Sequence, residues 1–140
     1  MFEGTTLVKL DAKGRLAIPV RYREAFVVSG IETLTFTRHP DGCLLIYPPD
    51  IWEKKRKALA ALPFSARALQ RLVLGSAQTV TPDAAGRLLV PSSLRALALP
   101  DREAVLIGLG EHFELWDLQT YKAAEAKALA EGFDDVDFVF

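Results

Sequence analysis

The sequence predicts an α+β fold, mainly β, that arose by internal tandem duplication. A stretch from Asp11 to Pro19 recurs from Asp83 to Pro91, 72 positions later, and Asp, Ala, Gly, Arg, Leu and Pro keep their offsets. An arginine follows each proline by four residues. Short apolar and β-branched segments bounded by turn residues surround both copies, as is typical of strands. A repeat of this length indicates a duplicated structural unit.

The first unit is expected to run strand, turn, strand, helix, strand, strand, helix. Asp11 to Gly14 predict the turn, because Asp accepts a bond from an amide two residues on and Gly tolerates positive φ. Pro19 lacks an N–H, so it ends a strand and can open a helix. The expected strands span residues 5–10, 15–18, 32–37 and 43–47, and the expected helices span 20–28 and 51–62.

Three details of this half follow from local patterns. Leu34 and Phe36 alternate with threonines, which predicts a half-buried strand. Asp50 is the expected N-cap of helix 51–62. Ser65 is the expected cap of a following helix that ends near Gly75, with one apolar face formed by Ala66, Leu69, Leu72 and Val73.

The second half repeats the plan. Its expected strands span 76–82, 87–90, 103–109 and 112–116, and its expected helices span 91–97 and 118–131, the last with Tyr121, Ala124 and Ala128 inward. The chain is therefore divided into an N-terminal repeat (1–62), a linker helix (63–75), a C-terminal repeat (76–131) and an acidic, aromatic tail (132–140). The tail lacks a period, so it is expected to be loose or docked on a neighbour.

Charge separates the two halves more clearly than the net charge of −1 suggests. Residues 1–71 hold 12 Lys and Arg against 7 Asp and Glu, whereas residues 72–140 hold 5 against 11. This asymmetry indicates a basic face in one half and an acidic face in the other. No apolar run is long enough for a spanning helix, so no membrane partner is expected.

The sequence shows no arrangement of residues that predicts catalysis or a cofactor. His39 and His112 have no nucleophile or carboxylate at a diagnostic spacing, and Cys43 begins an apolar strand as an inert thiol. One cysteine allows neither an internal disulfide nor a cysteine metal cluster. We therefore expect no enzyme activity, no metal, no cofactor and no small-molecule substrate.

The repeated Asp-x-x-x-Arg spacing leaves two readings open. In one, Asp11 with Arg15 and Asp83 with Arg87 only hold their turns together, and such exposed pairs add about 0–1 kcal/mol each. In the other, the turns present fixed cations to a phosphate backbone or to guanine. Solvated helix faces explain the other cations more simply, namely Arg21, Arg23 and the run from Lys54 to Lys57.

The opening of the chain resembles the start of MraZ proteins. It reads Met-Phe-x-Gly-x-x-x-Val-x-Leu-Asp-x-Lys-Gly-Arg-Leu-x-Ile-Pro-x-Arg-Tyr-Arg. Tyr47-Pro48 with Trp52-Glu53, Gln70-Arg71-Leu72 with Leu74-Gly75, the second Asp83 to Pro91 motif, and Phe113-Glu114-Leu115-Trp116 extend the resemblance in order to Trp116. The Gly-Arg-x-x-x-Pro core is also similar to swapped-hairpin modules of the AbrB type.

The resemblance implies a double swapped-hairpin β-barrel, one AbrB-like half per repeat, with short flanking helices. It also implies a cytoplasmic, nucleoid-associated bacterial regulator, expected to repress the division and cell-wall gene cluster. Its partners would be double-stranded DNA at direct promoter repeats and further copies of itself in a ring, commonly an octamer. A structural or protein-interaction barrel that does not bind DNA is the alternative.

The resemblance also assigns residues. Lys13 and Arg15 carry over most directly as DNA contacts, and Arg87, Arg21 and Lys9 complete the candidate set, while Asp11, Gly14, Asp83 and Gly86 form the structural turn motif. The two copies differ, because Ala85 replaces Lys13 and Ser93 replaces Arg21. We therefore expect the first copy to be the principal DNA reader and the second to be mainly architectural.

Overall fold

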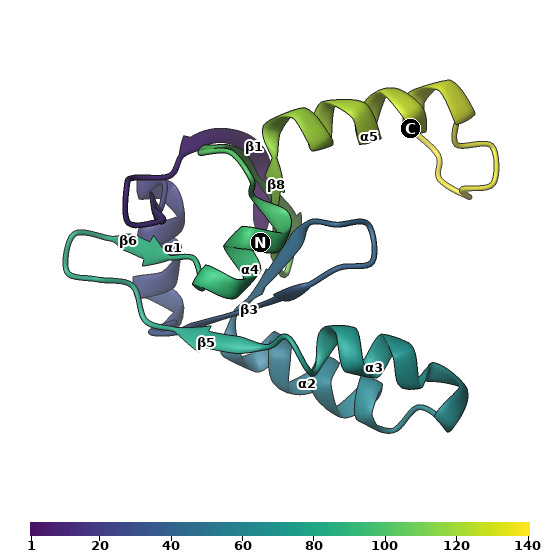
Figure 1. Cartoon of the computed structure of the whole chain (residues 1–140), viewed down its shortest axis with the longest axis horizontal. Coiled ribbons are helices and arrows are strands. Elements are labelled where there is room, and N and C mark those ends of the chain that lie inside the picture. Colours follow the sequence, from purple (N-terminus) through teal and green to yellow (C-terminus); the bar gives the residue numbers. More distant parts are fainter.

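The computed structural model describes all residues from 1 to 140 and shows an α+β fold (Figure 1). The strands are β1 (Phe2–Lys9), β2 (Arg15–Ala17), β3 (Leu34–Arg38), β4 (Leu44–Tyr47), β5 (Gln78–Val80), β6 (Arg87–Leu89), β7 (Glu103–Gly110) and β8 (Phe113–Asp117). The helices are α1 (Val20–Ser29), α2 (Pro49–Ala60), α3 (Arg67–Val73), α4 (Ser92–Ala98) and α5 (Leu118–Glu131), with a short 3-10 helix η1 (Phe64–Ala66) before α3.

The two halves of the chain interleave. Six strands form one antiparallel sheet in the order β1-β7-β8-β4-β3-β5, and β2 pairs with β6 in a separate two-stranded ribbon. Thus β1 pairs only with β7, and β5 pairs only with β3, so each half borrows its partner strand from the other. The repeat counterparts are β1 and β5, β3 and β7, and β4 and β8. When each strand is replaced by its counterpart, the same order results, read from the other edge of the sheet. The duplication is therefore built into the pairing of the whole sheet.

The repeated motif supplies the centre of the core. Leu16 and Leu88 lie opposite each other in the ribbon, and both are almost fully buried. Ile18 and Val90 follow them into the same apolar cluster, which also holds the packed rings of Phe2, Tyr22, Phe26 and Phe113. Burying a leucine of this kind stabilises the fold by about 1.5–3 kcal/mol. The ribbon is thus anchored by its inward side chains, and its outward side chains face solvent.

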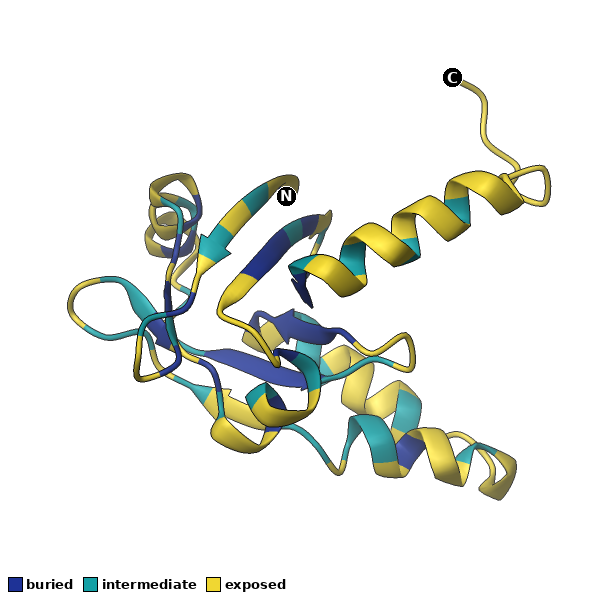
Figure 2. Ribbon diagram, turned by 45° about the horizontal axis from the view of Figure 1, so that its top comes forward, coloured by how far each residue is buried: buried dark blue, intermediate teal, exposed yellow.

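Strand β3 corrects one prediction. It begins at Leu34, not at residue 32, and it is buried on both faces rather than one (Figure 2). Thr37 donates its hydroxyl hydrogen bond to the carbonyl of Val73, and the hydroxyls of Thr35 and Thr79 lie 3.0 Å apart. The alternation was correct, but α3 packs on the threonine face and Thr79 of the neighbouring strand β5 contacts Thr35, which a single-strand pattern does not reveal.

The two predicted caps around α2 and α3 are wrong. Helix α2 begins at Pro49, so Asp50 lies in its first turn, where the helix dipole favours a negative charge. Ser65 lies inside η1, and α3 begins after Ala66 without a side-chain cap. Proline can start a helix without a polar cap because its φ is already helical and its missing N–H would be unsatisfied there.

The buried residue of α3 is Gln70 rather than a member of the predicted apolar face. Its amide nitrogen donates to the carbonyls of Leu59 (2.9 Å) and Leu62 (3.2 Å) at the end of α2. Leu69, which was expected to face inward, is exposed. Carbonyls at a helix end lack the intrahelical partners of the interior, and Gln70 donates to two of them, although that of Leu59 also accepts the N–H of Leu62. A polar contact therefore joins α2 and α3.

Helix α5 has the predicted bounds, and the three residues predicted to face inward are the less exposed ones. Tyr121, Ala124 and Ala128 are half-buried, whereas most of the remaining helix is exposed (Figure 2). Asp117 caps the helix by accepting the backbone N–H of Thr120 at 3.0 Å. Residues 133–140 follow as an exposed segment outside any helix or strand. None of the helices combines the length and the apolar character needed to cross a membrane.

Candidate nucleic-acid interface

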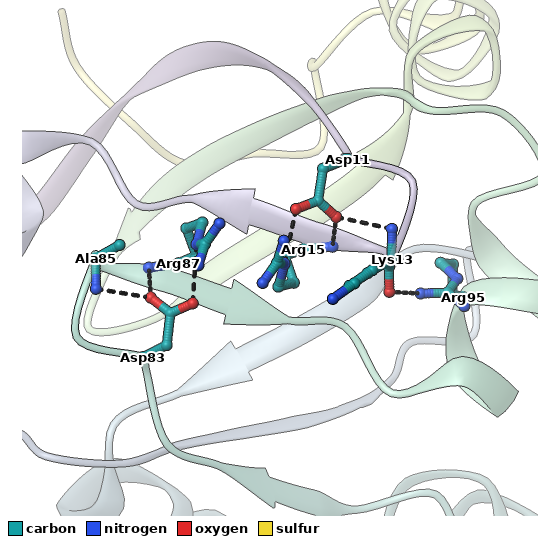
Figure 3. A network of polar contacts seen from close by, with 7 residues as sticks. All are labelled: Asp11, Lys13, Arg15, Asp83, Ala85, Arg87 and Arg95. Atoms are coloured by element: carbon teal, nitrogen blue, oxygen red, sulfur yellow. Dashed lines mark hydrogen bonds and ion pairs between the residues drawn. The ribbon is translucent and has the colours of Figure 1, made fainter.

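The first turn of the repeated motif joins β1 to β2 and is built around the Asp11 carboxylate. Its Oδ1 accepts the backbone N–H groups of Lys13 (3.0 Å) and Arg15 (2.9 Å), and its Oδ2 lies 2.7 Å from Nε of Arg15 (Figure 3). The N–H of Gly14 donates to the carbonyl of Asp11 at 3.0 Å. One carboxylate therefore closes the turn and fixes the arginine.

The hydrogen bonds have an electrostatic consequence. The backbone N–H of Arg15 lowers the pKa of Asp11 to about 2, with help from the Arg15 side chain and the N–H of Lys13. Asp11 is therefore a carboxylate at any physiological pH. It holds Arg15 through Nε, and neither Nη group of Arg15 has a partner within the chain. The guanidinium is therefore held in one orientation, and its two Nη groups are free to donate hydrogen bonds to a ligand.

The second turn, between β5 and β6, has the same geometry. Oδ1 of Asp83 accepts the N–H groups of Ala85 (3.0 Å) and Arg87 (2.8 Å), and Oδ2 lies 2.8 Å from Nε of Arg87 (Figure 3). The backbone N–H of Arg87 is the main cause of the lowered pKa of Asp83. Both turns therefore hold an arginine in the same way, and the side chain at the tip distinguishes them: Lys13 in one, Ala85 in the other.

Each turn is also covered by an arginine from the opposite repeat. Nη1 of Arg95 donates to the carbonyl of Lys13 at 2.9 Å, and a Cβ on Gly14 would lie 1.2 Å from that nitrogen. Arg23 covers Gly86 in the same manner, with its Cδ 2.5 Å from the position of a Cβ. Both glycines also have positive φ, +83° and +74°. Glycine is required at each turn, and Arg23 and Arg95 add a cation beside it.

Sequence reasoning did not assign Arg23 and Arg95 to the site. The signal was available, because each arginine follows its motif proline by four residues. That spacing placed both on predicted helices, and for Arg23 a solvated helix face was the simpler interpretation. Only the interleaving of the repeats carries each one to the other repeat's turn.

The two arginines of the motif project from the same face of the β2–β6 ribbon. Arg15 lies opposite Leu89, and Arg87 lies opposite Ala17. Diagonal neighbours of this kind are about 7–8 Å apart. Because Leu16 and Leu88 point into the core, Arg15 and Arg87 point outward. A two-stranded ribbon has the dimensions to enter the major groove of B-DNA.

The other two candidate residues lie outside this arrangement. Arg21 donates from Nη2 to the hydroxyls of Thr6 (2.9 Å) and Tyr22 (3.0 Å), and its guanidinium lies 4.4 Å from the centre of the Tyr22 ring. It is therefore engaged with β1 and its own helix. Lys9 is exposed at the end of β1, opposite Glu103, two residues before Asp11.

The basic run of α2 lies elsewhere. Arg56 and Lys57 pair with Glu53 at 2.6 and 3.2 Å. Figure 1 shows α2 at the bottom of the view, away from the two turns at the left. The structure does not bring the Lys54 to Lys57 run to the motif arginines.

Comparison with known proteins identifies the family. The family model described as "MraZ protein, putative antitoxin-like" matches residues 1–74 and again residues 73–137. The chain belongs to the MraZ family. The two successive matches of the MraZ family model also divide the chain where the repeated motif indicates a duplication.

Individual relatives agree with the MraZ family match. A protein of Bordetella pertussis is 52% identical over 136 residues, which cover 97% of this chain and 96% of the relative. Relatives from Burkholderia cenocepacia and Ralstonia pickettii are 49% and 47% identical over 135 residues, covering 96% of this chain and 95% of each relative. All three are named "Transcriptional regulator MraZ", a name that denotes no enzyme class.

Proposed function

We propose that the chain is a sequence-specific DNA-binding transcriptional regulator that contacts double-stranded DNA through the outer face of the β2–β6 ribbon and its two turns. The observation that carries the proposal is the way Arg15 and Arg87 are held. Each is fixed through Nε by an aspartate, and each points outward on the same ribbon face. The name of the relatives supports the same function.

The free edge of each guanidinium suits nucleic acid. Two Nη groups in one plane can donate to two phosphate oxygens, or to O6 and N7 of guanine in the major groove. Lys13 adds a flexible cation for phosphate at the first turn only. The first turn is therefore the principal reader, and the second turn is mainly architectural, with Arg87 as an auxiliary contact.

The finer features of the fold and assembly belong to the same proposal. We infer a double swapped-hairpin barrel made from repeats 1–62 and 76–131 joined by the linker 63–75, which the cross-repeat strand pairing supports. A homo-oligomeric ring, commonly of eight copies, would place many ribbons on successive direct repeats of a promoter. Linked binding events of this kind raise avidity without new contacts.

The proposed target follows the family. It is the promoter of the bacterial division and cell-wall gene cluster, which the protein would repress from the cytoplasm in association with the nucleoid. The proposal includes no cofactor.

A gel-shift measurement with DNA from upstream of the protein's own gene tests the proposal. The wild type is expected to retard this DNA, with an affinity that falls steeply as salt rises. Arg15→Glu is expected to abolish the shift. Lys122→Glu is the matched control, because it makes the same charge change at an exposed position on α5. If Arg15→Glu binds like the wild type, the site is wrong; if the wild type does not bind, the function is wrong.

The second candidate is a structural or protein-interaction module, and the identical geometry of the two turns favours it. If Asp11 and Asp83 only hold the turns, Arg15 and Arg87 contribute equally to folding and neither contributes to DNA binding. Thermal unfolding and promoter binding of the same two arginine variants separate the candidates.

A further inference from the structure

An apolar groove of about 430 Å³ lies beside helices α2 and α3. It is formed by the end of β4, helix α2 and helix α3. Its apolar wall includes Tyr47, Trp52, Leu59, Leu62, Leu69 and Val73. Leu62 and Leu69 are 44% and 39% exposed, so the wall is open to solvent. Exposed apolar surface of this kind marks a site of association.

The C-terminal tail, residues 133–140, has the apolar side chains that such a groove could bind. Residues 133–140 read Phe-Asp-Asp-Val-Asp-Phe-Val-Phe, and all five apolar side chains are exposed. The rings of Phe138 and Phe140 contact each other, with centroids 5.0 Å apart, and they pack on no other ring. The tail is therefore a short apolar segment that covers nothing in its own chain.

The charges of the groove and the tail are opposite. Residues 50–75 carry six cations and two acids, whereas residues 133–140 carry three aspartates and no cation. Glu53 pairs with Arg56 and Lys57, but Lys55, which lines the groove, has no carboxylate partner. If the apolar side chains of a tail entered the groove, an aspartate beside them could pair with the Lys55 ammonium at its edge.

The interleaved repeats explain why the tail points outward. Helix α5 is the counterpart of α2, but α3 follows α2, whereas residues 133–140 follow α5 as an exposed segment outside any helix. The 14 residues of α5 make a helix about 21 Å long. Figures 1 and 2 both show it leaving the body at a different corner from α2 and α3. The tail is thus left exposed beyond α5.

We propose that the tail of one copy docks in the α2–α3 groove of a second copy. The inference rests on the homo-oligomer in the proposed function and gives that assembly a contact. Phe138 and Phe140 enter the apolar groove, and Asp137 pairs with Lys55. Because groove and tail are different surfaces, the contact is head-to-tail, which generates a closed ring when the rotation closes. The turns lie away from the α2–α3 hairpin in each copy, so this contact leaves them free for DNA (Figure 1).

The mass of the assembly in solution, measured by light scattering after size exclusion, tests the contact. The wild type is expected to have the mass of several copies of the 15.4 kDa chain. A chain ending at Gly132 and the variant Ala58→Glu, which places a carboxylate in the groove, are both expected to fall to the single-chain mass. Ala60→Glu is the matched control, because it lies on α2, is exposed and does not line the groove. A truncated chain that keeps the wild-type mass overturns the proposal.

Mixing the two variants separates docking between copies from docking within one chain. The truncated chain keeps a groove, and Ala58→Glu keeps a tail, so one of each is expected to form a 1:1 dimer and nothing larger. If the mixture stays at the single-chain mass, docking between copies is wrong. Binding of the wild type to promoter DNA is measured separately, so a failure of the proposed function is seen without reference to the tail.

Discussion

The two turns of the repeated motif are alike in how they hold an arginine and different in what they present. Corresponding hydrogen bonds of Asp11 and Asp83 agree within 0.1 Å. The tip of the first turn carries Lys13, whereas the second carries Ala85. The covering arginines differ too, because Arg95 hydrogen-bonds the first turn while Arg23 only packs on the second.

This comparison separates architecture from recognition. What both turns share, namely the aspartate, the glycine and the covering arginine, shapes the ribbon. What only one turn has can affect binding without affecting shape. Variants of a residue that both turns share are therefore expected to cost similar stability at either turn, whereas variants of an unshared residue are expected to change DNA binding alone.

The largest effect is expected from the shared glycines. Gly14→Ala and Gly86→Ala place a Cβ at positive φ and against the covering arginine, and each should lower the free energy of unfolding by about 2–4 kcal/mol. Gly30→Ala is the control, because Gly30 also has positive φ but nothing within 4 Å of the added Cβ. Its expected loss is about 1–2 kcal/mol, the cost of a Cβ in the left-handed region alone. Urea unfolding measures all three, and equal losses would show that the covering arginines do not constrain the turns.

A smaller effect is expected from the unshared tip residue. Lys13→Ala should weaken promoter binding a few-fold and reduce the slope of log affinity against log salt by about 0.9, the change for one phosphate contact. Ala85→Lys should make the opposite change if the second turn lies near the backbone. Titrations at several salt concentrations measure both slopes. An unchanged slope in Lys13→Ala would remove Lys13 from the interface.

The smallest effect is expected from pH. A carboxyl with a pKa lowered by folding stabilises the fold above its unfolded pKa of about 3.9, and this contribution is lost as pH falls through the folded value. For Asp11 the window runs from about pH 4 to about pH 2. The pKa of Asp83 is also lowered, so its contribution is lost in the same direction, as pH falls below the unfolded pKa. NMR titration should place the Asp11 midpoint near 2, and Asp11→Asn should flatten the pH dependence of unfolding in this window. A midpoint at the model-peptide value would mean that the turn bonds do not form in solution.

The sequence predicted the local elements better than their surroundings. The motif turns, helix α5 and the strand pairs were predictable because turn residues, prolines and apolar alternation act over a few residues. Burial of Thr35 and Thr37 and the role of Gln70 were not, because both depend on α3 packing against elements distant in the chain. The covering of Gly14 by Arg95 spans 81 positions and follows only from interleaving.

The promoter affinities of Arg15→Gln and Arg87→Gln test the central claim most directly. Both substitutions remove the guanidinium and its bond to the aspartate, so both should cost similar, small amounts of stability. Arg15→Gln is expected to weaken binding by about tenfold or more, the scale of one lost bidentate contact, and Arg87→Gln by a few-fold. Equal losses would contradict the distinction between the two turns, and unchanged affinity in both would contradict DNA recognition by the ribbon.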